Sequence, residues 1–369
     1  MLDGNSLPSI SVPAMATTEE LSRRFRDFGS SSTHSRAPLY STIATAMADD
    51  TDVVRLLQAA PEPQQIPVLL FASVHHLLLG GQGLRLASHY PNLSAAPVDD
   101  DPVGAFREFV LGHAEELTEL ISTRHTQTNE VGRCAQFLPP FGLLAAEVGA
   151  LAHIDVGTSA GLNLLLPHYS YEFEPGGRVG GESTVHLHCR TSGNMPLPEE
   201  MPNIVRSIGL DLMPIDVHDD EEIRWLQACV WPDQADRFAR LVAAIELARS
   251  APPDVRRGDA VADLAAIVEE AAAYGHPVVT NSWVLNYLPH ETRLDYVAAL
   301  DRIGAERDVS WVIAEAPGQT PGLPVPTTDP PEEITVVTLV RWRAGKRSAQ
   351  RLGTTHPHGY WFRWEPAEG

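Results

Sequence analysis

Apolar side chains recur every three or four residues through most of the first 145 positions, a spacing that predicts amphipathic helices. Thr17 and Glu20 have the separation of a capping box, and the helix that follows places Leu21, Phe25 and Phe28 on one face. Further helices are predicted over 39–47, 54–60, 66–79, 106–124 and 132–145, the last interrupted by Pro139 and Pro140. No alternating strand pattern precedes residue 150, so we expect a flexible N-terminus over 1–16 and an all-helical cap domain over 17–145.

The pattern changes at Leu151, where short apolar runs typical of buried strands begin to alternate with helices. Strands are predicted over 151–156, 204–212, 255–260, 277–284 and 309–314, and helices over 219–230, 235–249, 261–274 and 291–303. An insert at about 169–190 is predicted to hold two hairpin strands, and 334–342 with 360–364 to form a closing antiparallel pair. This order predicts an α/β domain over 146–369, a Rossmann-like, mostly parallel sheet with an antiparallel last strand.

Charge and cysteine content exclude several classes of function. The chain has 27 Lys and Arg against 48 Asp and Glu, a formal charge of −21 that would repel nucleic acid and anionic membranes. The three cysteines lie too far apart for a zinc site or a disulfide framework, so no metal is expected. The start of the chain has no basic or apolar leader, and 66–79 is short for a membrane span, so we expect a cytoplasmic protein.

The strongest local signal is the glycine turn between the predicted strand 151–156 and the helix that begins at Leu162. Gly157 and Gly161 allow a sharp turn and a close approach of a ligand to the backbone. The helix N-terminus beyond them offers free N–H groups, and an adenosine-containing cofactor often binds at such a place. Asp155, Ser159 and Asn163 flank the turn and are candidate cofactor contacts. A tight turn without any ligand is the alternative.

Two later acids favour the cofactor interpretation. Asp211 ends the predicted strand 204–212, where an acid can accept hydrogen bonds from both ribose hydroxyls. Asp259 follows the next strand and is a candidate for the adenine amino group. The alternative for Asp259 is the cap of the following helix.

A serine hydrolase is a further alternative, because residues 157–161 also match G-x-S-x-G, the nucleophile elbow. Ser159 would be the nucleophile and a later histidine such as His356 would complete the triad. The helical upstream region and the lack of an HGGG-type oxyanion loop count against it.

The chain from about 150 to 369 resembles a class I S-adenosylmethionine-dependent methyltransferase. The resemblance rests on the segments 153–161, 208–211, 257–260 and 278–282, which have the order and spacing of that fold's first four motifs. Departures are Ser159 in place of the middle glycine, the insert at 169–190, and the lack of an amino-methylation signature after the fourth strand. The resemblance implies S-adenosylmethionine as cofactor and an acceptor site beside the fourth strand.

Candidate acceptor residues follow from that placement. The resemblance places Asn281, Trp283, Asn286 and Tyr287 at the end of the fourth strand, where Tyr287 is a candidate to orient an acceptor or act as a base. The polar segment that includes Gln127, Asn129 and Glu130 is a candidate to reach over the site from the cap. Its alternative role is helix capping. We therefore take Tyr287, Asn281 and Glu130 as candidate catalytic groups and the other four residues as candidate substrate contacts.

Nearly the whole chain more closely resembles an uncharacterised bacterial family catalogued as domain of unknown function 2332. The segments that carry this are 126–133, 158–164, 209–216 and 230–234. The family implies no established reaction. The sequence thus predicts methyl transfer from S-adenosylmethionine to a small cationic or neutral metabolite. The second hypothesis is a non-catalytic metabolite sensor or enzyme partner, and the third is the Ser159 hydrolase. The sequence does not indicate an oligomeric state.

Overall fold

The computed structural model describes residues 16–30, 36–94, 101–325 and 333–368. These residues form two compact units, which are described separately. The first unit comprises 1–127 with 224–235, and the second comprises 128–223 with 236–369. Of the segment 1–16, predicted to be flexible, residues 1–15 lie outside the described residues, as does most of the predicted loop at 94–101. Ala16 is buried, and its amide donates to Gln65 Oε1 (3.1 Å).

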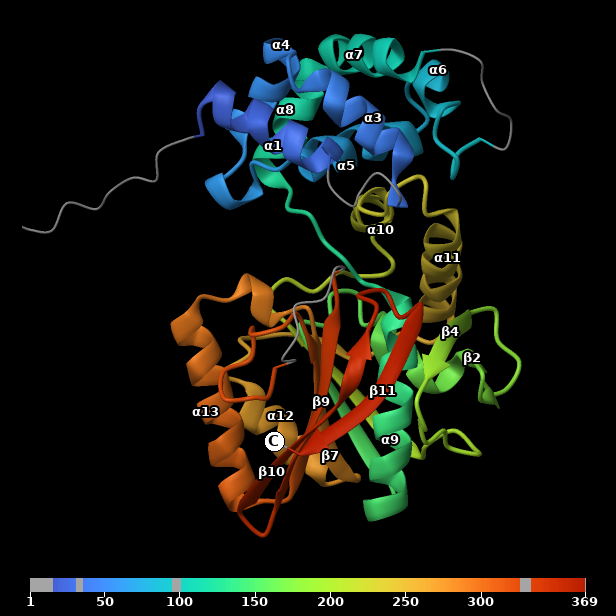
Figure 1. The fold of residues 1–369 in the computed structure, drawn as a ribbon, viewed down its shortest axis with the longest axis vertical. Helices are drawn as coiled ribbons and strands as arrows, with labels where there is room; N and C mark the ends of the chain where they lie inside the picture. Colours follow the sequence, from blue (N-terminus) through green and yellow to red (C-terminus); the bar gives the residue numbers. More distant parts are fainter. Residues whose placement is uncertain (1–15, 31–35, 95–100, 326–332, 369) are drawn as a thin grey trace, which may run out of the picture. The chain divides into compact units, whose positions relative to one another are not determined.

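The described part of the first unit consists of helices and their connections (Figure 1). Its elements are α1 (Thr18–Ser30), α3 (Pro38–Met47), α4 (Thr51–Val54), η1 (Arg55–Ala59), η2 (Glu62–Gln64), α5 (Pro67–Leu79), α6 (Leu84–Ala87), α7 (Pro102–Gly112), α8 (Ala114–Thr123) and the last turns of α10 (Asp220–Ala228). The capping box is confirmed, because the Thr17 amide donates to Glu20 Oε2 (2.7 Å) and the Glu20 amide to Thr17 Oγ1 (3.2 Å).

Aromatic side chains fill the interior of this unit. Tyr40 stacks on Phe71 with ring centroids 4.4 Å apart, and Phe25 and Phe106 meet Phe71 at its edges. The single helix predicted over 106–124 is instead two, α7 and α8, separated at His113. The helix predicted over 54–60 is mainly the 3₁₀ helix η1.

The second unit is built on one open sheet of eleven strands in the order β3-β2-β4-β11-β10-β9-β8-β7-β1-β5-β6. Its strands are β1 (Leu151–Val156), β2 (Ser170–Glu174), β3 (Gly177–Val179), β4 (His186–Ser192), β5 (Ile204–Asp211), β6 (Val255–Arg257), β7 (His276–Ser282), β8 (Val309–Glu315), β9 (Thr335–Arg343), β10 (Lys346–Thr355) and β11 (Trp361–Glu368). Its helices are η3 (Val131–Arg133), α9 (Cys134–Val148), η4 (Leu162–His168), α11 (Ala235–Ser250), α12 (Leu264–Ala272), η5 (Leu285–Tyr287) and α13 (His290–Glu306).

The five strands β6, β5, β1, β7 and β8 are mutually parallel and form one half of the sheet. Taken in chain order they lie 3-2-1-4-5, so the winding reverses between β1 and β7. Their carboxyl ends therefore meet along one edge on either side of that point. In open α/β sheets, ligands bind in the crevice at such a switch point.

Alternation along β1 assigns its side chains to two layers. Ala152, Ile154 and Val156 join the apolar core beneath α12 and α13. His153 lies on the opposite face, where its ring meets Phe141 of α9 at a centroid distance of 5.0 Å. The side chain of Asp155 therefore lies on the α9 face, as the period of two requires.

Three sequence predictions for this unit were wrong. The insert strands β2 and β4 are parallel neighbours, and the hairpin is β2–β3. β9 and β11 do not pair with each other; each pairs antiparallel with β10, which the sequence analysis missed because its outer half is polar. α9 continues through Pro139 and Pro140, so the two prolines do not end the helix; both side chains are buried, and packing offsets the cost of the two missing N–H donors.

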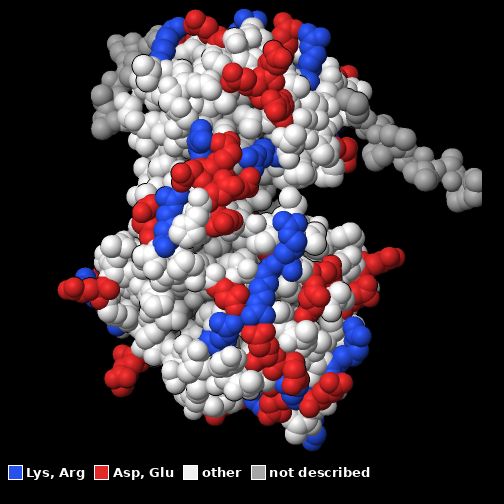
Figure 2. Space-filling model, turned by 180° about the vertical axis from the view of Figure 1, so that it is seen from behind, with Lys and Arg blue, Asp and Glu red and all other residues white. Residues whose placement is uncertain are grey.

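The surface carries charges of both signs. On the face drawn in Figure 2, basic side chains lie beside acidic ones instead of forming a broad basic patch. Arg206 and Arg256, for example, both pair with Asp254 and Glu270. In the described parts of the chain, no helix combines the length and apolar character needed to cross a bilayer.

Candidate functional site at the carboxyl edge of the sheet

The glycine turn after β1 is held by the acid at the end of β5. The Ser159 amide donates to Asp211 Oδ2 (2.7 Å), and the Met213 amide donates to Asp211 Oδ1 (2.8 Å). Asp211 is half-buried, and a carboxylate has about four lone-pair positions. It therefore keeps acceptor capacity for a ligand while it fixes the turn.

The turn has an unusual backbone. Gly157, Ser159 and Gly161 have φ values of 73°, 57° and 74°, a region that favours glycine. A Cβ atom at Gly157 would overlap Val284, and one at Gly161 would overlap Val255. Ser159 holds this conformation without being glycine, and its Oγ is buried with no hydrogen-bond partner among the described residues. Both features mark the turn as a candidate binding element.

Asp155 lies in β1, two residues before Gly157. It is 3% exposed and accepts a hydrogen bond from Thr280 Oγ1 (2.8 Å) on β7. Burial raises the pKa of Asp155 to about 6, an effect that the Thr280 hydrogen bond opposes and the Asp211 charge reinforces. Burial also lowers the pKa of His153, whose Nε2 lies 2.8 Å from the same hydroxyl, to about 3. The three groups form a buried polar contact between β1 and β7.

Asn129 and Asn163 tie the turn to the segment that precedes α9. Asn129 Oδ1 accepts from the Leu162 amide (3.3 Å), so it occupies one N–H at the start of η4. Asn163 Oδ1 accepts from Cys134 Sγ (3.4 Å). Both asparagines are buried, and the helix predicted to begin at Leu162 is the 3₁₀ helix η4. These contacts position the turn.

Asp259 lies close to its alternative role, but the N-cap position of α12 is Asp263. Its Oδ1 accepts from the amides of Val261 and Ala262, both at 2.8 Å, and these hydrogen bonds lower its pKa. The side chain caps the turn before α12. It is exposed, and it lies two residues beyond Arg257, the β6 neighbour of Asp211.

The candidate acceptor residues at the end of β7 differ from one another in burial and in hydrogen-bond partners. Asn281 is fully buried, and its amide contacts Glu315, Tyr296 and Trp311. Trp283 has a φ of 57°, and its Nε1 donates to Thr335 Oγ1 (2.7 Å).

Asn286 and Tyr287 follow in η5. Asn286 Nδ2 is buried without a partner among the residues described, whereas Tyr287 is 69% exposed. Gln127 belongs to the first unit, where its amide donates to Cys229 Sγ (3.5 Å).

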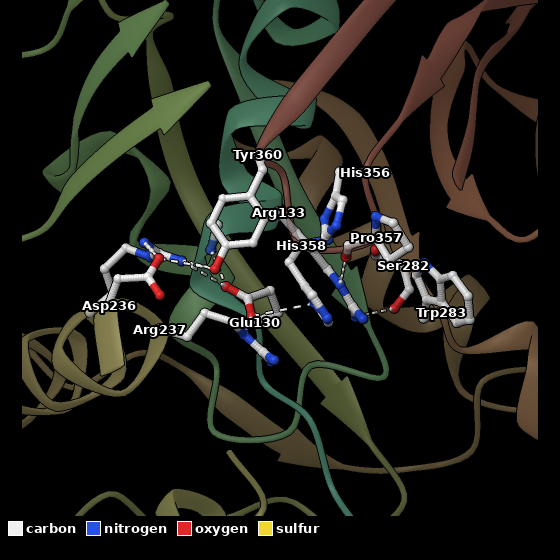
Figure 3. Close-up of polar contacts among 12 residues, drawn as sticks. Glu130, Arg133, Asp236, Arg237, Ser282, Trp283, His356, Pro357, His358 and Tyr360 are labelled. Carbon is white, nitrogen blue, oxygen red and sulfur yellow. Dashed lines mark hydrogen bonds and ion pairs between the residues drawn. The ribbon is translucent and has the colours of Figure 1, made fainter. Parts of the chain in front are cut away.

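Glu130 belongs to a charged cluster that sequence reasoning missed (Figure 3). Its Oε2 accepts from Arg237 Nε, its Oε1 accepts from the Gly132 amide (2.9 Å), and His358 Nδ1 lies 3.5 Å from Oε2. Arg240 Nη2 lies 4.0 Å from Oε1. Glu130 is 5% exposed, so this is a buried ion pair.

Two further members complete this cluster. Asp236 accepts from Arg240 Nη1 (2.8 Å) and from the hydroxyl of Tyr360 (2.9 Å). Arg133 donates to the carbonyls of Pro357 (Nε, 3.0 Å) and Ser282 (Nη1, 3.0 Å). Sequence separations of more than 100 residues hide this cluster from a linear search; the only local signal is Glu130 and Arg133 in one polar motif.

Glu315, at the end of β8, was also missed. Its Oε1 accepts from Asn281 Nδ2 and from the amides of Val284 and Leu285. Its Oε2 is buried with no partner in the described structure. Burial raises the pKa of Glu315 to about 7, against the lowering effect of these hydrogen bonds. The side chain lines a pocket of about 20 Å³, room for about one water molecule.

Within the described ranges, no group of three His, Cys, Asp or Glu side chains is placed to hold a metal ion. The three cysteines are free thiols.

Fold and site together define an α/β protein with an open, mostly parallel sheet and a polar site at the carboxyl edge of the parallel strands. The model of the family described as "Uncharacterized protein conserved in bacteria (DUF2332)" matches residues 22–364, and the chain belongs to this family. No curated protein and no solved structure matched the chain.

Proposed function

We propose that the second unit binds S-adenosylmethionine at the switch point between β1 and β7 and transfers its methyl group to a small-molecule acceptor. The observation that carries this proposal is the hydrogen bond from the Ser159 amide to Asp211, because it joins a glycine turn to an acid at the end of the neighbouring strand. Nucleotide cofactors bind to this combination of turn and acid in doubly wound sheets. The strand order 3-2-1-4-5 supports the same conclusion.

The residues present fit such a cofactor. Asp211 keeps acceptor capacity for ribose hydroxyls, and the buried Oγ of Ser159 lacks a partner among the described residues. Gly157 permits the left-handed backbone of the turn and the close packing of Val284 against it. Asp155 precedes the turn in β1, and the exposed Asp259 is within the same strand-end region.

Bound S-adenosylmethionine would supply an electrophilic methyl group, so the chain's own task is to hold the acceptor in line and keep it unprotonated. Trp283 and Asn286 follow β7, the strand beside β1, and are the proposed acceptor contacts. Glu315 has a pKa near neutrality and a free oxygen within the described structure, which suit a proton acceptor. Asn281 holds that carboxyl group, Glu130 orients the arginines, and Tyr287 remains a candidate to orient the acceptor.

One observation favours the hydrolase as a second candidate. A nucleophile elbow places its serine on a strained turn, and Ser159 has a left-handed φ of 57°. No histidine of the described chain donates to or accepts from its Oγ. Ester hydrolysis that is lost in Ser159→Ala, with S-adenosylmethionine binding unchanged or absent, would favour this candidate.

Calorimetric titration of the full chain with S-adenosylmethionine and S-adenosylhomocysteine tests the proposal. We expect micromolar binding that weakens at least tenfold in Asp211→Asn. Asp216→Asn is the matched control, because Asp216 also accepts from a backbone amide two residues on, that of His218 (2.9 Å), but is exposed and lies beyond the strand end. Lack of binding by folded wild-type protein contradicts the proposal, and binding without transfer to any acceptor favours a sensor.

A further inference from the structure

Arg133 is a buried cation held by neutral groups. It is 7% exposed, and its two hydrogen bonds go to the carbonyl oxygens of Pro357 and Ser282. No carboxylate oxygen of the described residues lies within the 4.0 Å ion-pair distance of its guanidinium. A guanidinium has five N–H donors, so three have no hydrogen-bond partner among the described residues. Removing a charge from water without an opposite charge is costly, and burial accordingly lowers the pKa of Arg133.

The carboxylates nearest to Arg133 are paired with other arginines. Arg133, Arg237 and Arg240 contribute three positive charges, whereas Glu130 and Asp236 contribute two negative ones. Glu130 is already paired with Arg237, and Asp236 with Arg240. Glu130 and, more weakly, Glu315 act on Arg133 through space, but neither carboxylate lies within ion-pair distance of its guanidinium. The guanidinium of Arg133, which has no carboxylate within ion-pair distance among the described residues, can therefore attract an anion, although the whole chain carries −21.

A second buried group lacks a partner at the same place. Gln136, one turn after Arg133, donates from Nε2 to Ser282 Oγ (3.2 Å), and its Oε1 is buried without a partner among the described residues. Arg133 contacts the carbonyl of the same serine, and its guanidinium lies 6.0 Å from the ring centroid of Trp283. An unused donor set and an unused acceptor thus flank the end of β7.

We propose that Arg133 binds an anionic group, a carboxylate or a phosphate, on the acceptor, and that Gln136 Oε1 accepts a hydrogen bond from a hydroxyl or amine next to it. This assigns an anionic acceptor where net charge had favoured a cationic or neutral one. As an acceptor site it rests on the proposed function. Binding of an anion at Arg133 does not depend on the cofactor.

Calorimetric titration of the full chain with sodium lactate, sodium propionate and inorganic phosphate, at constant ionic strength and without S-adenosylmethionine, tests the proposal. We expect wild-type protein to bind lactate or phosphate, and Arg133→Gln to weaken that binding at least tenfold. Tighter binding of lactate than of phosphate identifies the anionic group as a carboxylate, and the reverse identifies a phosphate. A several-fold preference for lactate over propionate, lost in Gln136→Met, supports the adjacent donor.

Two controls separate binding from folding. Arg302→Gln removes an exposed arginine on α13 and should bind like wild type. Arg133→Lys keeps the charge without the guanidinium geometry and should bind with intermediate affinity if Arg133→Gln fails to fold. Absence of binding of all three probes to wild-type protein, or unchanged binding in a folded Arg133 variant, overturns the proposal. Because the cofactor is absent, this outcome is independent of the S-adenosylmethionine titration.

Discussion

Asn281 Nδ2 lies 2.7 Å from Glu315 Oε1, and the amides of Val284 and Leu285 donate to that same oxygen. The second oxygen, Oε2, has no partner in the described chain. Burial stabilises the protonated carboxyl group, whereas these hydrogen bonds favour the ionised form. In the protonated form the hydrogen-bonded oxygen acts as a carbonyl and Oε2 carries the proton. The loop after β7 is thereby fastened to the end of β8.

Glu315→Gln should stabilise the protein at alkaline pH. The pKa of Glu315 is raised from 4.5 to about 7, so the folded state binds the extra proton and wild-type stability falls as pH rises from about 4.5 to 7. Glutamine keeps the accepting oxygen and has no charge to bury. We expect a gain of roughly 3 kcal/mol at pH 8 and none at pH 4, measured by urea unfolding. A difference independent of pH would contradict the assignment.

Glu147→Gln is the control with the opposite sign. Arg343 and Arg341 lower the pKa of Glu147 despite some burial, so its contribution is present above the unfolded pKa and disappears on acidification. Glu147→Gln should therefore lower the free energy of unfolding more at pH 7 than at pH 3.

Glu130→Ala should destabilise the second unit. The substitution leaves Arg237 buried without its carboxylate, which costs about 3–5 kcal/mol. Glu147→Ala breaks partly exposed pairs with Arg341 and Arg343 and should cost less than about 1 kcal/mol. Chemical denaturation of both variants checks this, and equal losses would show that the Glu130 pair is not buried in solution.

Gly157→Ala should destabilise the glycine turn by about 2 kcal/mol or more, because alanine disfavours a φ of 73° and its Cβ would overlap Val284. Adding Val284→Ala should restore only the steric part of the loss. Gly181→Ala is the control, since a Cβ there meets no atom within 4 Å. Thermal unfolding measures all three, and full rescue by the double variant would argue against backbone strain.

Thr280→Val should lower the free energy of unfolding by about 1–3 kcal/mol. It removes the hydroxyl that donates to buried Asp155 and lies against His153. Thr184→Val, at an exposed position, should change the unfolding free energy by less than about 0.5 kcal/mol. Similar values for the two variants would mean that water replaces the hydroxyl.

The sequence by itself determined the elements whose signals are local. The capping box of Thr17 and Glu20, the strand 151–156 and the position of Asp211 at a strand end all follow from spacing, because each depends on neighbours a few residues away. The alternation of strands and helices after Leu151 likewise predicted a mostly parallel sheet.

Only the tertiary structure decided which distant groups meet. Glu130 and Arg237 are 107 positions apart, and Arg133 and Pro357 are 224 apart, so no periodicity connects them. Strand pairing is equally non-local: β4 joins β11, and β10 separates β9 from β11, through backbone hydrogen bonds that any residue sequence can make. Burial also decides the chemical properties of these groups. It raises the pKa of Glu315 and lowers that of Arg133 because it excludes water, and no linear pattern specifies which side chains are buried.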